Sequence, residues 1–365
     1  MKKVMLVFGT RPEAIKMCPL VLELRSRPEF ETLVCVTGQH RQMLEQVLRA
    51  FGVKPDADLS VMRDRQTLYD ITCRVLEGMR GVLEREKPDC VLVHGDTTTT
   101  FASALAAFYT GVPIGHVEAG LRTYDIQSPY PEEFNRQAVD IITRFHFAPT
   151  EVSRQNLLRE GKPEKGIYVT GNTAIDALRT TVRPDYTHPE LEWAADSRLV
   201  LLTAHRRENL GEPMRHIFRA IRRIVEEFPD VKVLYPVHLN PAVRSVAEEE
   251  FRGLERVRLI EPLDVLDFHN FLARAYLVLT DSGGIQEEAP SLGKPVLVLR
   301  DTTERPEGVA AGTLKLAGTR QEDIYREFRT LLTDAAAYEA MSRASNPYGD
   351  GFASRRIADV LAREL

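Results

Sequence analysis

The 365-residue sequence has no apolar run long enough to cross a membrane and no block of like charges. A spanning helix needs roughly 18 apolar residues in succession. The apolar start MKKVMLVFG meets Arg11 and Glu13 too early for a secretory leader. The 48 basic and 53 acidic residues are mixed along the chain and leave a formal net charge of −5. We therefore expect a cytoplasmic protein that binds neither membrane nor nucleic acid.

Cysteine and the common cofactor motifs are also scarce. The four cysteines show no C-x-x-C spacing, and Cys35 and Cys90 fall inside apolar runs, which favours buried free thiols over disulfides or a zinc site. The sequence contains no G-x-G-x-x-G, G-x-x-x-x-G-K-[ST], G-x-S-x-G or H-E-x-x-H. These absences exclude the usual dinucleotide fingerprint and the P-loop, and they leave serine-hydrolase and zinc-protease chemistry without support.

The sequence does contain a regular alternation of short apolar runs and longer helical patterns. Runs such as KVMLVFG, DCVLVHGD, RLVLLTAH and AYLVLTDSGG are apolar at nearly every position, which is typical of parallel strands covered on both faces. Helical patterns between them, such as TFASALAAFYTG, complete βαβ units. We therefore predict an α/β fold of two Rossmann-like domains, each with a doubly wound parallel sheet, and the chain length suits two domains.

The alternation breaks at the polar stretch TTVRPDYTHPELEWAADS, which contains two prolines and the only tryptophan. We place a linker over residues 183–197, between a first domain of residues 1–182 and a second domain of residues 198–351. The last segment, residues 352–365, is amphipathic and helical, and it is a candidate to pack back on the first domain.

Nearly every unusual polar residue follows the end of an apolar run. In the first half these segments are GTRPEAIK, GQHRQ, HGDTTTT and HVEAGLR, and in the second half TAHRREN, PVHLNP, TDSGG and RDTTERPEG. Ligands of open α/β sheets bind beyond the carboxyl ends of the strands. We therefore predict a ligand cleft between the two domains, lined by these segments.

The segment TDSGGIQEEA predicts a diphosphate site. Gly283 and Gly284 stand where a strand passes into a helix, so their N–H groups, together with Ser282, suit a diphosphate. Glu288, about one turn further on, suits the two hydroxyls of a ribose. A plain serine N-cap with acids in the first turn explains the same residues, and both interpretations remain open at this point.

Cations and histidines follow several of the other strands. The cations in such places are Arg11, Lys16, Arg206, Arg207 and Arg305. Each alone is an ordinary surface charge, but their shared placement favours a diphosphate held without a metal. His205 and His238 also end their strands, whereas His94, His116 and His146 occupy strand interiors and are expected to be core or supporting groups.

Three acids are candidates for acid–base catalysis. Asp96 ends the run VLVHGD, Glu118 lies in GHVEAG, and Glu132 with Glu133 opens a helix after SPYP. An acid that ends an apolar strand is poorly placed for structure unless it is paired, and burial readily raises its pKa. Simpler roles also remain open, since Asp96 is placed to cap a helix and Glu132 is an ordinary helix-start acid.

Read together, the motifs resemble one family closely. FGTRPEAIK, HGDTTTT, HVEAGLRT, SPYPEEFNR, TAHRREN, PVHLNP, TDSGGIQEEAPSLGKPVLVLRDTTERPEG and NPYGDG occur in the order and at the spacing of the non-hydrolysing, bacterial type of UDP-N-acetylglucosamine 2-epimerase. Tyr130 stands where relatives often carry Trp or Phe. The resemblance implies the glycosyltransferase-B architecture, a homodimer, and interconversion of UDP-GlcNAc and UDP-ManNAc without metal or nicotinamide, in support of bacterial surface polysaccharide synthesis.

The resemblance also implies roles for individual residues. The residues implied to hold the uridine diphosphate are Arg11, His205, Ser282, Gly283, Gly284, Glu288 and Arg305. Those implied to act near the sugar are Asp96, Glu118 and Glu132, supported by Lys16 and Arg136. The implied route removes the C2 proton as UDP leaves C1, giving 2-acetamidoglucal, and then adds UDP back. Glu118 or Asp96 is expected nearest C2, with Glu132 assisting and His205 stabilising the departing phosphate.

A second, activating UDP-GlcNAc is implied as well. The residues that match its site are Gln39, Gln42, Arg65, Gln66, Glu132, Arg206 and His238. Three alternatives to the epimerase are a glycosyltransferase of the same architecture, a hydrolysing epimerase that releases UDP and ManNAc, and a non-catalytic nucleotide-sugar sensor. The absence of an apolar acceptor patch disfavours the first, the second-substrate residues disfavour the second, and the full set of acids disfavours the third.

Overall fold

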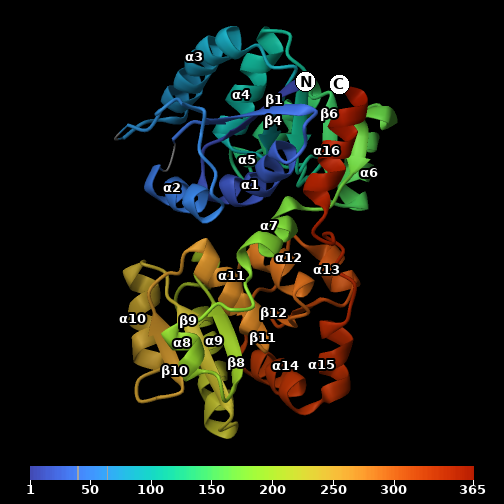
Figure 1. The fold of residues 1–365 in the computed structure, drawn as a ribbon. Helices are drawn as coiled ribbons and strands as arrows, with labels where there is room; N and C mark the ends of the chain where they lie inside the picture. Colours follow the sequence, from blue (N-terminus) through green and yellow to red (C-terminus); the bar gives the residue numbers. More distant parts are fainter. Residues whose placement is uncertain (39–40, 64) are drawn as a thin grey trace. The chain divides into compact units, whose positions relative to one another are not determined.

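The chain divides into two compact units. The computed structural model describes residues 1–38, 41–63 and 65–365, with the backbone alone of residues 41 and 42. One unit comprises Met1–Thr180 together with Tyr348–Leu365, and the other comprises Thr181–Pro347 (Figure 1). Both are α/β units built on parallel sheets, as the sequence predicts.

The first unit contains a seven-stranded sheet in the order β3-β2-β1-β4-β5-β6-β7. Its strands are β1 (Lys2–Phe8), β2 (Phe30–Val36), β3 (Ala57–Asp58), β4 (Cys90–His94), β5 (Ile114–Val117), β6 (Phe145–Ala148) and β7 (Ile167–Val169). Every pairing is parallel. The order reverses between β1 and β4, which is the position where doubly wound sheets bind their ligands.

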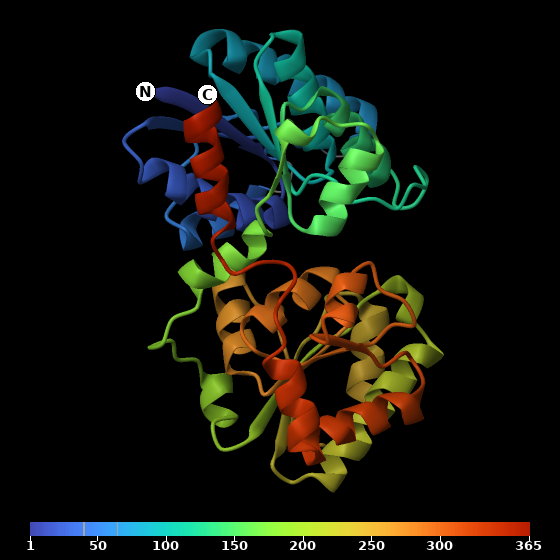
Figure 2. The same ribbon diagram turned by 90° about the vertical axis from the view of Figure 1, so that its right-hand side faces the viewer.

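Helices cover the sheet of the first unit. They are α1 (Arg11–Arg25), α2 (Arg41–Ala50), α3 (Leu68–Glu86), α4 (Thr98–Tyr109), α5 (Glu132–Ile142), α6 (Glu151–Arg159), α7 (Thr173–Thr181) and α16 (Ala353–Glu364). Apolar side chains of α3 and α4, such as Val75, Met79 and Ala102, pack with those of β1 and β4 in one buried cluster. Helix α16 packs beside α1, with the two chain ends close together (Figures 1 and 2).

The second unit contains a six-stranded parallel sheet in the order β10-β9-β8-β11-β12-β13. Its strands are β8 (Arg198–Thr203), β9 (Val231–Pro236), β10 (Val257–Ile260), β11 (Leu277–Thr280), β12 (Val296–Val298) and β13 (Leu314–Leu316). Its helices are α8 (Pro189–Trp193), α9 (Glu212–Glu227), α10 (Pro241–Glu250), α11 (Val265–Arg274), α12 (Gly283–Ser291), α13 (Pro306–Ala310), α14 (Gln321–Thr333) and α15 (Ala335–Ser342). Here the strand order reverses between β8 and β11.

Residues 183–197 do not form the separate linker expected from their polarity. They lie inside the second unit, where Trp193 packs against the cluster that contains Leu201, Phe271 and Val296. The Arg258 guanidinium lies 4.3 Å from the centroid of the Trp193 ring, which extends this packing. The chain returns to the first unit between Pro347 and Tyr348, a few residues before the expected boundary.

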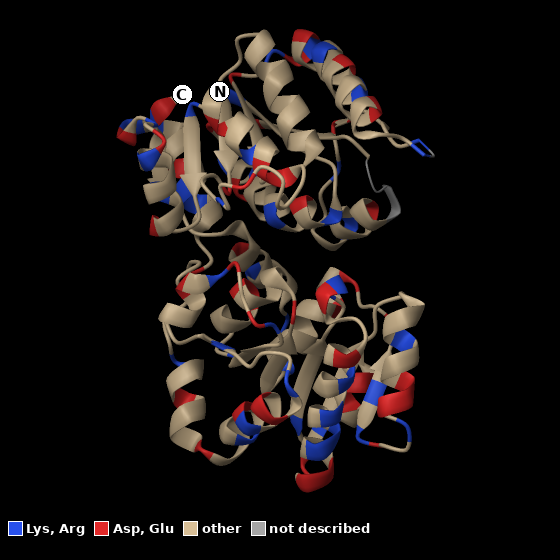
Figure 3. Ribbon diagram, turned by 180° about the vertical axis from the view of Figure 1, so that it is seen from behind, with Lys and Arg blue, Asp and Glu red and all other residues tan. Residues whose placement is uncertain are grey.

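Three further expectations concern the thiols, membrane-spanning helices and the distribution of charge. Cys18, Cys35 and Cys90 are buried free thiols, but Cys73 is exposed, because it lies on the solvent side of the amphipathic helix α3. None of the helices formed by residues 1–38, 41–63 and 65–365 is both long and apolar enough to cross a membrane. Basic and acidic residues are interspersed over both units (Figure 3).

Candidate active site

Residues that follow β1, β4 and β5 form a polar cluster at the carboxyl edge of the first sheet. Helix α1 starts there with a capping box, in which Thr10 accepts from Glu13 N and the Glu13 carboxylate accepts from Thr10 N at 2.7 Å. Glu13 is buried, and its other oxygen accepts from Thr97 Oγ1 at 2.7 Å, so it joins the start of α1 to the start of α4. This contact fixes the start of α1, the helix that carries Arg11 and Lys16, against the start of α4.

Glu118 is the most constrained acid of this cluster. It follows β5 in the left-handed region, with φ of 66°, and its Oε2 forms an ion pair with Lys16 Nζ. The same oxygen accepts from Asn172 Nδ2 at 3.2 Å and lies 3.5 Å from His94 Nε2. Burial alone would raise the pKa of Glu118, but Lys16 and His94 together hold it well below its usual range. Glu118 is therefore held as a carboxylate.

Asp96 is a neighbouring acid whose pKa is shifted in the opposite direction. It follows Gly95, whose φ of 65° turns the chain out of β4, and its carboxylate lies 3.1 Å from Arg136 Nη2. Burial raises the pKa of Asp96 although Arg136 opposes the change. The Asp96 carbonyl accepts from Asn135 Nδ2 at 2.9 Å, so both ends of this residue are held by α5.

The two adjacent glutamates at the start of α5 have different surroundings. Glu133 is buried and accepts from Thr123 N at 3.0 Å and Tyr124 N at 2.9 Å, so it holds the preceding loop. Glu132 is half-buried, and its Oε2 has no hydrogen-bond partner among the described residues. Glu132 therefore keeps an acceptor for a ligand, whereas Glu133 serves the fold.

The polar edge of the second sheet is organised by Asp281, directly after β11. This carboxylate is fully buried, and its Oδ2 accepts from His205 N and Arg206 N, both at 2.8 Å, and from Asn209 Nδ2 at 3.0 Å. It therefore fixes the loop after β8. The His205 ring stacks on His238 with centroids 5.5 Å apart. Burial lowers the pKa of His205, and His238 and Arg206 act in the same direction.

Helix α12 begins with the glycine pair next to this loop. Ser282 makes no side-chain capping bond to the helix, so the structure does not support its alternative role as a plain serine N-cap. A Cβ on Gly283 would lie 3.9 Å from Arg206 Nη2 and 4.0 Å from Arg305 Nη2. The first N–H groups of α12 thus stand between two guanidinium groups, which is the arrangement that binds an anion.

Two acids of α12 complete this edge of the second unit. Glu287 is buried and forms an ion pair with Arg305, which positions that guanidinium. Glu288 Oε2 lies 3.5 Å from His269 Nε2, and Thr181 Oγ1 lies 2.7 Å from the other ring nitrogen. Glu288 is therefore held one turn inside the helix, where the sequence places a ribose-binding acid.

The residues predicted for a second substrate are described only in part. Gln39 lies outside the described residues, as does the side chain of Gln42. Arg65 is exposed with φ of 55°, and Gln66 accepts from Arg63 N at 3.0 Å in the same loop. Within residues 1–38, 41–63 and 65–365, no group of three or more His, Cys, Asp or Glu side chains is arranged to hold a metal ion.

Sequence reasoning missed three supporting residues, Glu13, Asp140 and Asp281. Glu13 had a signal, since T-x-x-E before a helical pattern is a capping box. Asp281 had a weaker signal, as an acid directly after an apolar strand. Asp140 had none, because an acid inside a helical pattern is normally a solvated residue.

A site of this kind belongs to the nucleotide-sugar enzymes with two Rossmann-like domains, the glycosyltransferase-B class of fold. The sequence model of the UDP-N-acetylglucosamine 2-epimerase family matches residues 22–362. The chain belongs to that family, of the non-hydrolysing bacterial type, and is an enzyme that epimerises UDP-N-acetylglucosamine at C2.

Similar proteins cover nearly the whole chain. A UDP-N-acetylglucosamine 2-epimerase from Bacillus subtilis is 64% identical over 98% of this chain and 94% of its own length. The structure of S. aureus MnaA with UDP is 55% identical with a TM-score of 0.89, covering 100% of this chain and 96% of that one. The epimerase from Neisseria meningitidis, solved with UDP-GlcNAc, is 48% identical with a TM-score of 0.88, covering 99% of this chain and 100% of that one.

Proposed function

We propose that this enzyme epimerises UDP-GlcNAc by eliminating UDP and adding it back. A carboxylate takes the C2 proton, the C2–H electron pair forms the C1=C2 bond, and the C1–O bond breaks with its electrons passing to the β-phosphate oxygen. The products of this half-reaction are UDP and 2-acetamidoglucal. In the return step, an acid protonates C2 on the opposite face while the UDP oxygen forms a bond to C1.

The observation that carries this proposal is the contrast between Glu118 and Asp96. Two carboxyl groups at neighbouring strand ends have pKa values shifted in opposite directions, because Lys16 holds one as a carboxylate and burial favours the protonated form of the other. Such a contrast is how one site assigns a base and an acid. We assign Glu118 as the base at C2 and Asp96 as the acid, with Glu132 assisting through its unpartnered oxygen.

The second unit is proposed to bind the leaving group. Gly283 and Gly284 offer N–H groups to the diphosphate, Arg206 and Arg305 offer charge, and Glu288 takes the ribose hydroxyls. Because the pKa of His205 is lowered, it is proposed to assist the departing phosphate as a neutral hydrogen-bond donor. Support comes from the relatives solved with UDP and with UDP-GlcNAc. Arg11 and Ser282 are proposed as further phosphate contacts.

A second UDP-GlcNAc is proposed as an activator. Arg206, next to His205, and His238, which stacks on the His205 ring, are proposed to contact it. Gln39, Gln42, Arg65, Gln66 and Glu132 are proposed as its other contacts. We expect sigmoidal dependence of rate on UDP-GlcNAc and little reverse reaction from UDP-ManNAc alone. Hyperbolic kinetics over a wide concentration range would contradict this part of the proposal.

We also propose a cytoplasmic homodimer whose product supplies surface polysaccharide synthesis. Large apolar side chains are exposed on the neighbouring helices α3, α4 and α5, including Tyr69, Phe108, Tyr109 and Ile141. Exposed apolar side chains of this size suit burial against a second copy. Light scattering is expected to give twice the 41.3 kDa chain mass, and a monomer at micromolar concentration would contradict the dimer.

Positional isotope exchange tests the elimination. UDP-GlcNAc carrying ¹⁸O in the bridge between C1 and the β-phosphorus is incubated with the enzyme, and recovered substrate is analysed by ³¹P NMR. Once the C1–O bond breaks, the β-phosphate rotates, so the label is expected to enter non-bridging positions. Label that stays in the bridge while UDP-ManNAc accumulates would overturn the mechanism.

A further inference from the structure

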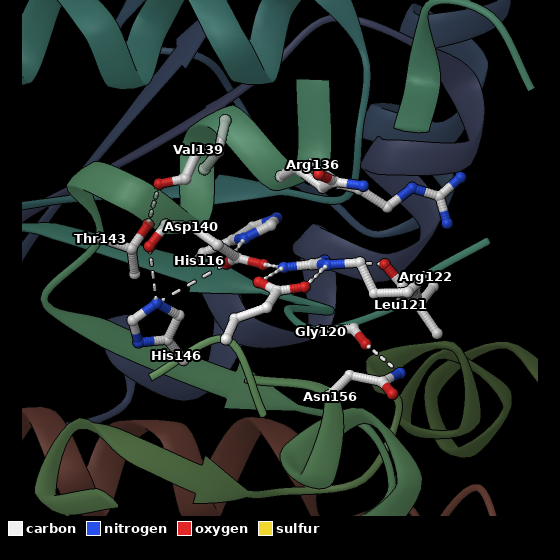
Figure 4. Close-up of polar contacts among 12 residues, drawn as sticks. His116, Gly120, Leu121, Arg122, Arg136, Val139, Asp140, Thr143, His146 and Asn156 are labelled. Atoms are coloured by element: carbon white, nitrogen blue, oxygen red, sulfur yellow. Dashed lines mark hydrogen bonds and ion pairs between the residues drawn. The ribbon is translucent and has the colours of Figure 1, made fainter. Parts of the chain in front are cut away.

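A buried cluster of charged and polar side chains contacts the backbone next to Asp96 in the first unit. His116 is fully buried in β5, with Nδ1 2.6 Å from Asp140 Oδ1 and Nε2 2.7 Å from the Gly95 carbonyl oxygen. Asp140 also accepts from Arg122 Nη2 at 2.6 Å, and Arg122 reaches Glu160 at 2.6 Å. Figure 4 shows Asp140 between His116 and Arg122.

Both ring nitrogens of His116 face an oxygen atom. Nδ1 lies against the Asp140 carboxylate and Nε2 lies against the Gly95 carbonyl oxygen, both within hydrogen-bond distance. The ring therefore joins a side chain of α5 to the backbone just before Asp96.

Complete burial on its own would raise the pKa of Asp140, but His116 and Arg122 hold it well below its usual range. Asp140 therefore stays ionised and keeps its partner. The pair fastens α5 to β5, because Asp140 belongs to the helix and His116 to the strand.

The same helix carries the groups that touch Asp96. Glu132, Arg136 and Asp140 are spaced four residues apart, so they lie along one stripe of α5. Arg136 pairs with the Asp96 carboxylate and Asn135 donates to its carbonyl, while Asp140 acts on the preceding carbonyl through His116. Three contacts from α5 thus converge on residues 95 and 96.

We propose that His116 is a positioning residue for the reaction: it transmits the position of α5 to the Gly95 carbonyl and so orients the catalytic Asp96. The inference rests on the proposed role of Asp96 at C2. His116 touches neither substrate nor reacting atoms, and its effect is exerted through the peptide that precedes Asp96. A small displacement of a catalytic group is enough to cost about 10- to 100-fold in rate.

Two substitutions separate positioning from stability. His116→Gln places an amide N–H near the position of Nε2, so it keeps the bond to Gly95 and loses Asp140. His116→Asn places an amide N–H near the position of Nδ1, so it keeps Asp140 and loses Gly95. The enzyme is assayed for kcat, KM, UDP affinity and thermal midpoint, with His146→Asn as the control. His146 is also buried, and its Nε2 lies 3.1 Å from the Asp140 carbonyl oxygen and 3.8 Å from the Asp140 carboxylate, so this control meets the same residue of α5 from a different strand, β6.

We expect the two His116 variants to rank in opposite order by kcat and by thermal midpoint. His116→Asn should lose about 10- to 100-fold in kcat while UDP affinity stays within about threefold, and His116→Gln should recover most of that loss although it is the less stable variant. His146→Asn should lose stability and keep kcat. A kcat that follows the thermal midpoint in all three variants, or an unchanged kcat in His116→Asn, would overturn the proposal.

Two further variants keep the test decisive. If His116→Asn does not fold, Asn135→Ala removes the neighbouring bond to the Asp96 carbonyl, and an unchanged kcat there would also overturn the positioning role. Asp96→Asn is assayed in parallel. Full activity of Asp96→Asn would contradict the proposed chemistry, whereas an inactive Asp96→Asn beside a fully active His116→Asn would contradict only this inference.

Discussion

The ion pair between Lys16 and Glu118 is expected to control the pH dependence of the reaction. Lys16 and Glu118 side chains are only 16% and 11% exposed, so solvent screens their attraction little. A cation at this range lowers the pKa of a carboxyl group by about 1–3 units, which corresponds to about 1.4–4 kcal/mol in favour of the carboxylate. Lys16→Met therefore removes the main charge that opposes the effect of burial on this pKa, and the pKa of Glu118 rises.

The direction of the kinetic effect follows from that shift. A base acts in its ionised form, so a higher pKa moves the acid limb of the kcat profile to higher pH. Lys16→Met is expected to move the acid limb of the kcat profile up by about 1–3 pH units, with a slope of one tenfold change per pH unit along that limb and full recovery by pH 9. Initial rates of UDP-ManNAc formation between pH 5 and pH 9 measure the profile.

Arg25→Met provides the matched control for this experiment. Arg25 is on the same helix α1, and it pairs with Asp56 at 3.1 Å across an exposed surface, where an ion pair contributes about 0–1 kcal/mol. Its pH profile should match that of the unaltered enzyme. A Lys16→Met profile parallel to the unaltered one, lowered by the same factor at every pH, would refute the role of Lys16 in holding Glu118 ionised.

Three other changes test separate parts of the structure. Glu288→Gln should weaken UDP binding about tenfold or more by calorimetry, since hydrogen bonds to a charged group contribute about 1.5–3 kcal/mol, whereas the exposed Glu249→Gln should leave it unchanged. Asp281→Asn keeps an oxygen for the three N–H groups but removes the negative charge that strengthens these bonds, so chemical denaturation should show a loss of about 1–3 kcal/mol together with weaker UDP binding. Gly9→Ala would place a Cβ 2.0 Å from Thr37 Oγ1, so the free energy of unfolding should fall by about 1–3 kcal/mol. Unchanged binding in the first case, or unchanged stability in the other two, would contradict these assignments.

Much of the fold could be predicted because the strands are buried on both faces. β4 and β5 are buried at every position, and a strand of that kind must read as a continuous apolar run. Polar residues after such runs then fall at one edge of a parallel sheet, which is why Asp96, Glu118 and the glycine pair of α12 could be located. The expectation failed at residues 183–197, which are largely exposed but belong to the second unit because Trp193 and Ala194 pack on its core.

The supporting contacts could not be predicted to the same extent. Glu132 and Glu133 are adjacent in sequence, and only the rotation of α5 about its axis decides which one faces the loop and which keeps an unpartnered oxygen. His116 was expected to be a supporting group, but its partner Asp140 lies 24 residues away on a helix, where nothing local marks it as buried. Such pairs depend on how elements pack, and sequence spacing carries little information about that.

Proton NMR of the enzyme with UDP-GlcNAc in D₂O, with no metal added, tests the central claim most directly. We expect UDP-ManNAc to appear with deuterium at C2, because the proton removed from C2 exchanges with solvent before the opposite face is protonated. UDP-ManNAc that retains its C2 proton would contradict epimerisation through cleavage of the C2–H bond, and free ManNAc with UDP would mean that the enzyme hydrolyses its substrate.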